Sequence, residues 1–304
     1  MPWMYAGAVT WSAATEGTGK TCRSSRAYVE SWDAILTGAK LYNRALSLFP
    51  GSGISMIVSP NIRARLHARL RQPPSASSVP QSLPVLFFGD LFTAGVATVA
   101  LNPSDKEYLD RGGVELEGGA RRFETLTSLG VTDRPSLTDE QCDRAIQKMR
   151  TYYQPGKPSY DWFQALDRVT RAMGYSYEVG EVAHLDLAQE ATNPTWSKLA
   201  QTSPVEFAAL RSSDLPFLRW QLETFPLHTV ICDGRTAFTE VSRLIGGQVR
   251  KEGRLQRITW YVGAASLNGR KVELVGWNIP LARPTGLGAA GEPELGRILK
   301  SHLG

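Results

Sequence analysis

An amide side chain follows a buried apolar segment, in a pattern that suits the placement of a water molecule for hydrolysis. Residues 96–101 are rich in β-branched side chains and predict a buried strand. Asn102-Pro103 ends that strand, because proline fixes φ and lacks a backbone donor. Open α/β sheets bind ligands at the carboxyl ends of their strands, which is where Asn102 is expected. Its carboxamide is a weak base, but it can accept a hydrogen bond from water and orient that water for attack.

A second polar segment follows the last apolar run, residues 272–277, which also predicts a strand. The segment after this strand contains Asn278 and then Arg283, Pro284, Thr285, Gly286 and Leu287. Arginine is a permanent cation, so Arg283 can stabilise a developing negative charge or hold a phosphate. Taken without further context, the segment has the composition of a flexible loop.

These two segments resemble the active-site motifs of the uracil-DNA glycosylase superfamily. The family's first motif reads Gly-hydrophobic-Asn-Pro-Gly or Gly-Gln-Asp-Pro-Tyr, where this chain has Ala100 in place of the leading Gly and Ser104 as the trailing residue. The second reads His-Pro-Ser-Pro-Leu-Ser or Asn-Pro-Ser-Gly-Leu-Ser, and Arg283 takes the place of its His or Asn. The resemblance covers roughly residues 83–304, with the motifs in the family's order and about 180 residues apart.

The resemblance implies roles for the residues of the first motif and for the strand end near the second. Asn102 would position the attacking water, with Pro103 and Ser104 beside the substrate. The departing uracil anion needs stabilisation at O2, since preorganised electrostatics usually supply the largest catalytic contribution. Arg283 would supply it, and Asn278 is the alternative.

The resemblance also implies a contact with DNA around the flipped base. Leu287 would be an apolar wedge that fills the gap left in the duplex. The residues that would hold the phosphates beside it are Pro284, Thr285 and Gly286.

A strand predicted at residues 182–187 occupies the place where the family reads the Watson–Crick edge of uracil with an Asn. Asp186 stands there, and His184 shares its strand face because alternate residues point the same way. A carboxylate accepts from N3–H but repels O4 unless it is protonated or compensated by His184; a core role for His184 is the alternative. Tyr108 is the first choice for an aromatic platform under the base, and Phe88 the second.

The chain outside these motifs predicts an α/β fold. Predicted strands fall at residues 85–88, 96–101, 182–187, 227–232, 258–262 and 272–277, and predicted helices at 121–129, 138–152, 162–173, 204–225, 235–244 and 292–302. This alternation favours a three-layer α/β/α sandwich with a central, mainly parallel sheet. We expect the glycosylase-like domain to span residues 83–304. Residues 1–82 would form a basic helical extension that packs on it or precedes it.

The charge of the chain is unevenly distributed. The net charge is +5, and residues 1–80 hold nine basic and three acidic side chains. Ile62, Leu66 and Leu70 predict a helix with an apolar stripe. The arginines that lie off this stripe are Arg63, Arg65, Arg69 and Arg71. A basic flank of this kind favours a polyanion such as DNA as partner, and a solvated helix face is the alternative.

Cysteine number and hydropathy exclude some classes of protein. The three cysteines, Cys22, Cys142 and Cys232, form no Cys-x-x-Cys pair and cannot supply four ligands to an iron–sulfur cluster. The longest apolar region, residues 85–101, is too short to span a bilayer and contains Asp90. We therefore expect a cytoplasmic, monomeric protein that needs no metal or cofactor.

The resemblance thus implies a monofunctional DNA glycosylase that flips uracil out of single- or double-stranded DNA and hydrolyses its glycosidic bond. The product would be an abasic site. One alternative is a glycosylase for hypoxanthine or xanthine, because Asp186 departs from the family's base-reading Asn. Another is a non-catalytic protein of the same fold that binds damaged or single-stranded DNA.

Overall fold

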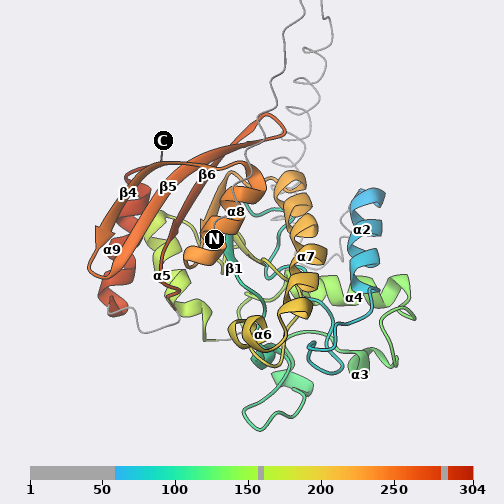
Figure 1. Cartoon of the computed structure of the whole chain (residues 1–304). Helices are drawn as coiled ribbons and strands as arrows, with labels where there is room; N and C mark the ends of the chain where they lie inside the picture. The colour runs from blue at the N-terminus through green and yellow to red at the C-terminus, as the bar shows by residue number, and fades with distance from the viewer. Residues whose placement is uncertain (1–58, 157–160, 282–286, 304) are drawn as a thin grey trace, which may run out of the picture. The chain divides into compact units, whose positions relative to one another are not determined.

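A six-stranded sheet with the strand order β2-β1-β3-β6-β5-β4 lies at the centre of the structure (Figure 1). This computed structural model describes residues 59–156, 161–281 and 287–303. The described residues all belong to one compact unit, Val58–Gly304. The strands are β1 (Val96–Ala100), β2 (Val182–Asp186), β3 (Thr229–Cys232), β4 (Gln248–Leu255), β5 (Ile258–Leu267) and β6 (Arg270–Trp277).

Four neighbouring strands of this sheet are parallel. β1 pairs in parallel with β2 on one side and β3 on the other, and β3 pairs in parallel with β6. Every residue of β1, β2 and β3 is buried. Strands covered on both faces read as continuous apolar runs, which is why the sequence shows them clearly.

Helices lie on both faces of the sheet. They are α2 (Pro60–Leu70), α3 (Leu126–Leu129), α4 (Asp139–Arg150), α5 (Phe163–Met173), α6 (Trp196–Thr202), α7 (Pro204–Thr224), α8 (Arg235–Ile245) and α9 (Gly288–Lys300). α5 packs against α9 on one face, and α7 and α8 lie on the other (Figure 1). Gly296 allows the first contact, since a Cβ there would clash with the carbonyl oxygen of Val169. The predicted three-layer α/β/α sandwich is confirmed.

The two strands at one edge of the sheet depart from the prediction. β5 is twice as long as the predicted strand at 258–262, and it pairs antiparallel with both β6 and β4. β4 was absent from the prediction because none of its residues is buried, so it lacks the apolar signal of a strand. The mainly parallel sheet therefore ends in an antiparallel hairpin.

Two predicted elements are wrong in extent. Residues 85–88 form no strand: only Phe88 bridges His184, and the segment packs as a buried loop along β2. The helix predicted at 121–129 shrinks to α3. Thr125 caps its first turn, and Gly130 ends it in a left-handed conformation with φ 70°.

Helix α2 belongs to the same compact unit as the sheet. Its apolar residues Leu66 and Leu70 are buried in the main hydrophobic core. The Pro/Ser-rich segment at 73–84 continues into that core through Val79 and Leu83 rather than forming an exposed linker. Residues 1–58 of the predicted N-terminal extension lie outside the described residues.

Acids of the same unit neutralise two of the arginines of α2 and its C-terminal end. Nη2 of Arg63 lies 2.6 Å from Oδ2 of Asp143, and Nη2 of Arg71 lies 2.6 Å from Oδ1 of Asp139. Both acids are on α4. These charges are therefore paired within the protein rather than presented as an uncompensated basic flank.

The other two arginines of α2 face α7. Arg69 is buried, with Nη2 2.9 Å from Oδ1 of Asp214. The guanidinium carbon of Arg65 lies 4.7 Å from the centre of the Trp220 ring. The prediction that Arg69 belongs to an exposed basic surface is wrong, because a charge count cannot show which charges are buried in pairs.

None of the helices in the described ranges is both long enough and apolar enough to cross a membrane.

Candidate functional site

The carboxyl ends of β1, β2 and β3 open onto one cavity of about 330 Å³. β1 has β2 on one side and β3 on the other, so the order of strands reverses there. Such a switch point is where open α/β sheets bind ligands, and the volume suits a small molecule or one nucleobase. Six residues predicted from the sequence line this cavity: Phe88, Asn102, Pro103, Ser104, His184 and Asp186.

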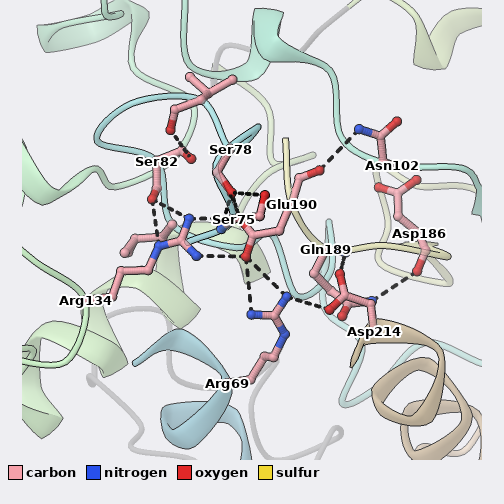
Figure 2. A network of polar contacts seen from close by, with 12 residues as sticks. Arg69, Ser75, Ser78, Ser82, Asn102, Arg134, Asp186, Gln189, Glu190 and Asp214 are labelled. Atoms are coloured by element: carbon pink, nitrogen blue, oxygen red, sulfur yellow. Dashed lines mark hydrogen bonds and ion pairs between the residues drawn. The ribbon is translucent and has the colours of Figure 1, made fainter. Parts of the chain in front are cut away.

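Asn102 lies just beyond the end of β1 with its amide nitrogen fully engaged. Nδ2 donates to the carbonyl oxygen of Glu190 at 3.2 Å, to Oγ1 of Thr192 at 3.1 Å and to the carbonyl oxygen of Pro103 at 3.1 Å. These bonds orient the carboxamide, and Figure 2 shows its oxygen turned away from Glu190. Oδ1 is therefore available as an acceptor for water.

A buried network of charges holds the segment that orients Asn102 (Figure 2). Arg134 donates to both carboxyl oxygens of Glu190, at 2.7 and 2.9 Å. Arg69 lies between Glu190 and Asp214, and Asp214 accepts from the backbone N–H of Gln189 at 2.8 Å. Two arginines thus balance two acids in a region with almost no solvent exposure.

His184 and Asp186 project from β2 into the cavity, as the strand alternation predicts. Nδ1 of His184 lies 2.7 Å from Oγ1 of Thr98, and Nε2 lies 3.4 Å from Oδ1 of Asp186. The imidazole is enclosed by aromatic rings, with Phe163 at 5.0 Å and Phe88 at 5.2 Å between ring centres. His184 is therefore a buried histidine whose partners fix its orientation.

Glu107 is a cavity residue that the sequence analysis missed. It ends the short 3₁₀ helix Asp105–Glu107 that follows the Asn-Pro-Ser turn, and its side chain is buried. Burial raises its pKa to about 8, although the hydrogen bond from Tyr152 and the charge of Arg122 lower it. The charge of Asp186 raises this pKa further. No sequence signal distinguishes Glu107, because Asp-Lys-Glu has the composition of an exposed turn.

Asp233 is the second residue that was missed, and here the sequence did carry a signal. It directly follows the predicted strand at 227–232, so it belongs at the ligand-binding edge. Its Oδ1 accepts from Nε1 of Trp277 at 2.8 Å and from the N–H of Leu281 at 2.9 Å. Its buried Oδ2 has no hydrogen-bond partner among the described residues. Burial raises the pKa of Asp233 to about 6, although these two hydrogen bonds lower it.

Three predicted site residues lie elsewhere in the structure. The hydroxyl of Tyr108 donates to the carbonyl oxygen of Leu83 at 2.6 Å, so this ring is in the core and is not the platform. Oδ1 of Asn278 accepts from the N–H of Thr259 and joins β6 to β5 instead of reaching the cavity. Leu287 is 5% exposed and packs in the core, so it is not presented as a wedge.

The sequence analysis also missed part of the aromatic wall of the cavity. Trp162 lines it together with Phe88 and Phe163, and its ring centre lies 5.4 Å from that of His184. Trp162 precedes α5, where the sequence predicted a helix residue. Helical periodicity cannot show which ring of such a segment faces a cavity.

Four predicted residues, Arg283, Pro284, Thr285 and Gly286, lie outside the described residues. Within the described ranges, no cluster of three or more His, Cys, Asp or Glu side chains could hold a metal ion. Cys142 and Cys232 are buried free thiols. No protein-family model and no curated protein sequence matches the chain.

Proposed function

We propose that this chain is a DNA glycosylase that hydrolyses the glycosidic bond of uracil, or of another deaminated base, flipped into the cavity at the ends of β1, β2 and β3. One observation carries the proposal: a small cavity with aromatic walls contains an oriented amide oxygen and a buried, under-partnered carboxylate. Asn102 and Asp233 supply these two groups.

In the proposed reaction, Asn102 orients the attacking water through Oδ1, and Asp233 accepts a proton from that water. A general base works best with a pKa near the operating pH, and the raised pKa of Asp233, about 6, meets this requirement. The water oxygen bonds to C1′ as the bond from C1′ to the base breaks. The electron pair leaves with the base, and Asp233, which is anionic until it takes the proton, stabilises the positive charge that develops on the sugar.

The departing base carries negative charge that must be stabilised. Arg283 is our candidate for this role, on the basis of its position after β6 in a segment that resembles the family's second motif. DNA, single- or double-stranded, would be the partner of the site. Asn278 is no longer a candidate, because it does not line the cavity and its side chain joins β6 to β5.

The test is single-turnover cleavage of oligonucleotides that carry one uracil, hypoxanthine or xanthine, with EDTA present and alkali added afterwards. Asn102→Ala should lower the rate by about 10²–10³-fold, as removal of a preorganised polar contact does in other enzymes. Asp233→Asn should lower it by a similar factor and abolish the acidic limb of the pH profile near pH 6. Neither change should weaken DNA binding more than a few-fold.

Asn268→Gly is the matched control, since Asn268 is exposed in the β5–β6 turn and remote from the cavity. It should cleave at the wild-type rate. Wild-type rates in both cavity variants would refute the assigned roles. Retained DNA binding without cleavage at any of the three bases would instead indicate a non-catalytic DNA-binding protein.

A further inference from the structure

Two acids from different elements line the same cavity next to its aromatic wall. Glu107 comes from the 3₁₀ helix after β1, and Asp186 from the end of β2. Both side chains are almost fully buried, and the negative charge of Asp186 disfavours ionisation of Glu107. A protonated carboxyl donates a hydrogen bond and a carboxylate accepts one, so two acids in one cavity can supply both roles to a ligand.

Tyr152 determines which oxygen of Glu107 carries a proton. Its hydroxyl donates to Oε2 at 2.8 Å, and Oε1 is the other oxygen of this cavity-lining carboxyl. The charged or titratable groups that act on Glu107 are Tyr152, Arg122 and Asp186, and burial outweighs the first two. At neutral pH the carboxyl is therefore protonated. Because Oε2 accepts from Tyr152, Oε1 carries the O–H.

Asp186 is set up as an acceptor. Thr98 Oγ1 lies 2.7 Å from the hydroxyl of Tyr177 and 2.7 Å from Nδ1 of His184. With Tyr177 donating to Thr98 and Thr98 donating to Nδ1, the imidazole keeps its own proton on Nε2, toward Asp186. Oδ1 of Asp186 has no hydrogen-bond partner among the described residues other than this long contact with His184. The carboxylate can therefore accept from a ligand.

We propose that Glu107 and Asp186 together read the lactam edge of a deaminated base: the Glu107 O–H donates to the carbonyl oxygen of the base, and the Asp186 carboxylate accepts from the adjacent ring N–H. This inference rests on the proposed function. Uracil presents this edge at C4=O and N3–H, and hypoxanthine and xanthine present it at C6=O and N1–H. The substrate class is therefore the deamination products rather than uracil alone.

The same pair rejects the parent bases. Cytosine and adenine present an amino group where the lactam has a carbonyl, and an unprotonated ring nitrogen where it has N–H. The Glu107 O–H would then face another donor, and the Asp186 carboxylate would face a lone pair. Leaving buried polar groups unpaired in this way is what gives enzymes their strongest discrimination, about 10⁴–10⁵-fold.

The first test measures binding, independently of cleavage. Fluorescence anisotropy would be recorded with single-stranded oligonucleotides that carry one 2′-fluorinated deoxyuridine, which resists hydrolysis, or the corresponding cytidine. Wild-type affinity for the uracil probe should fall at least fivefold between pH 7 and pH 9 as Glu107 loses its proton. Glu107→Gln, which keeps a neutral donor, should bind within about threefold of wild type at pH 7 and lose this pH dependence.

The second test measures discrimination. Asp186→Asn replaces a pure acceptor with an amide that can also donate, so the ratio of uracil to cytosine affinity should fall by on the order of 100-fold. Glu117→Gln is the matched control, because it makes a carboxyl-to-amide change at an exposed residue that does not line the cavity. It should leave both the ratio and the pH profile unchanged.

The outcomes separate this inference from the proposed function. If the wild type cleaves uracil while Glu107→Gln keeps the wild-type pH dependence and Asp186→Asn keeps the wild-type ratio, base reading by the pair is refuted and the glycosylase proposal stands. If the wild type neither cleaves uracil nor binds its probe more tightly than the cytosine probe, both are refuted.

Discussion

Glu190 and Glu107 are equally buried, at 2% exposure each, yet their surroundings differ sharply. Burial disfavours the charged form of both carboxyls. At Glu190, the hydrogen bonds and charges of Arg134, with the charge of Arg69, outweigh burial and hold its pKa below the usual value. At Glu107, burial outweighs the Tyr152 hydroxyl and Arg122, and the pKa rises to about 8. Burial alone therefore does not separate a structural acid from one suited to chemistry; the compensation of its charge does.

The two regions serve the same site in different ways. The network around Glu190 holds the backbone carbonyl that orients Asn102. Glu107 and Asp233 instead line the cavity itself, and Oδ2 of Asp233 has no hydrogen-bond partner among the described residues. One region supplies rigidity, and the other supplies groups that can exchange protons or bind a ligand.

Removing Arg134, which compensates the charge of Glu190, should have the largest effect on the free energy of unfolding. Arg134→Met leaves Glu190 buried with the Ser78 hydroxyl and the longer contacts from Arg69, and breaking a buried pair in this way costs as much as about 5 kcal/mol. Urea unfolding at pH 7 would measure the loss. The double variant Arg134→Met/Glu190→Met should recover part of it, because no uncompensated charge remains. An unchanged midpoint for the single variant would contradict the contrast between the two regions.

Removing the charge of Glu107 should instead raise the free energy of unfolding at high pH. The folded pKa of Glu107, about 8, lies above its ordinary value, so its favourable contribution is complete below about pH 4.5 and is lost as the pH rises through 8. Wild type should therefore lose on the order of 4 kcal/mol relative to Glu107→Gln between pH 5 and pH 9. Urea midpoints at several pH values would show this, and parallel profiles would exclude it.

The smallest effect should come from the hydrogen bond between Thr192 and Asn102, and it should be seen in the cleavage rate. Thr192→Val removes one of the three acceptors that orient the amide of Asn102. A loss of about 1 kcal/mol in transition-state stabilisation corresponds to roughly fivefold slower single-turnover cleavage, with DNA binding and stability unchanged. Thr192→Ser keeps the hydroxyl and should cleave at close to the wild-type rate. An equal loss in both variants would mean that the methyl group matters, and the hydrogen bond does not.

The buried half of the sheet could be predicted from the sequence, and the exposed half could not. β1 and β2 appear as short apolar runs because both of their faces are covered. β4 has no buried residue, so its pairing with β5 leaves no trace in the pattern of apolar positions. The apolar run at 85–88 wrongly predicts a strand. Its side chains are buried because the loop packs into the core, and the segment forms no ladder of strand pairs.

For the site, the sequence shows which residues end the strands, and it does not show which loop residues turn inward. Asn102 and Asp186 follow or end their strands and line the cavity, and Asp233 could have been found by the same rule. Glu107 becomes a buried acid only when Tyr152 and the chain around it pack over its side chain. Tyr108 lies one residue further along and turns into the core instead. That difference arises from tertiary packing.

The charge network also has a consequence for the order of folding. Arg69 and Asp214 are 145 residues apart in sequence, and Arg134 and Glu190 are 56 apart. Closing such long loops costs chain entropy before any contact rewards it, so contacts of this kind form late. The strand pairs of the sheet are just as distant, since Val96 pairs with Val182, 86 residues away, and with Thr229, 133 residues away. Sheet and network therefore close the same long loops, and competence of the site should appear in the same kinetic phase as the sheet.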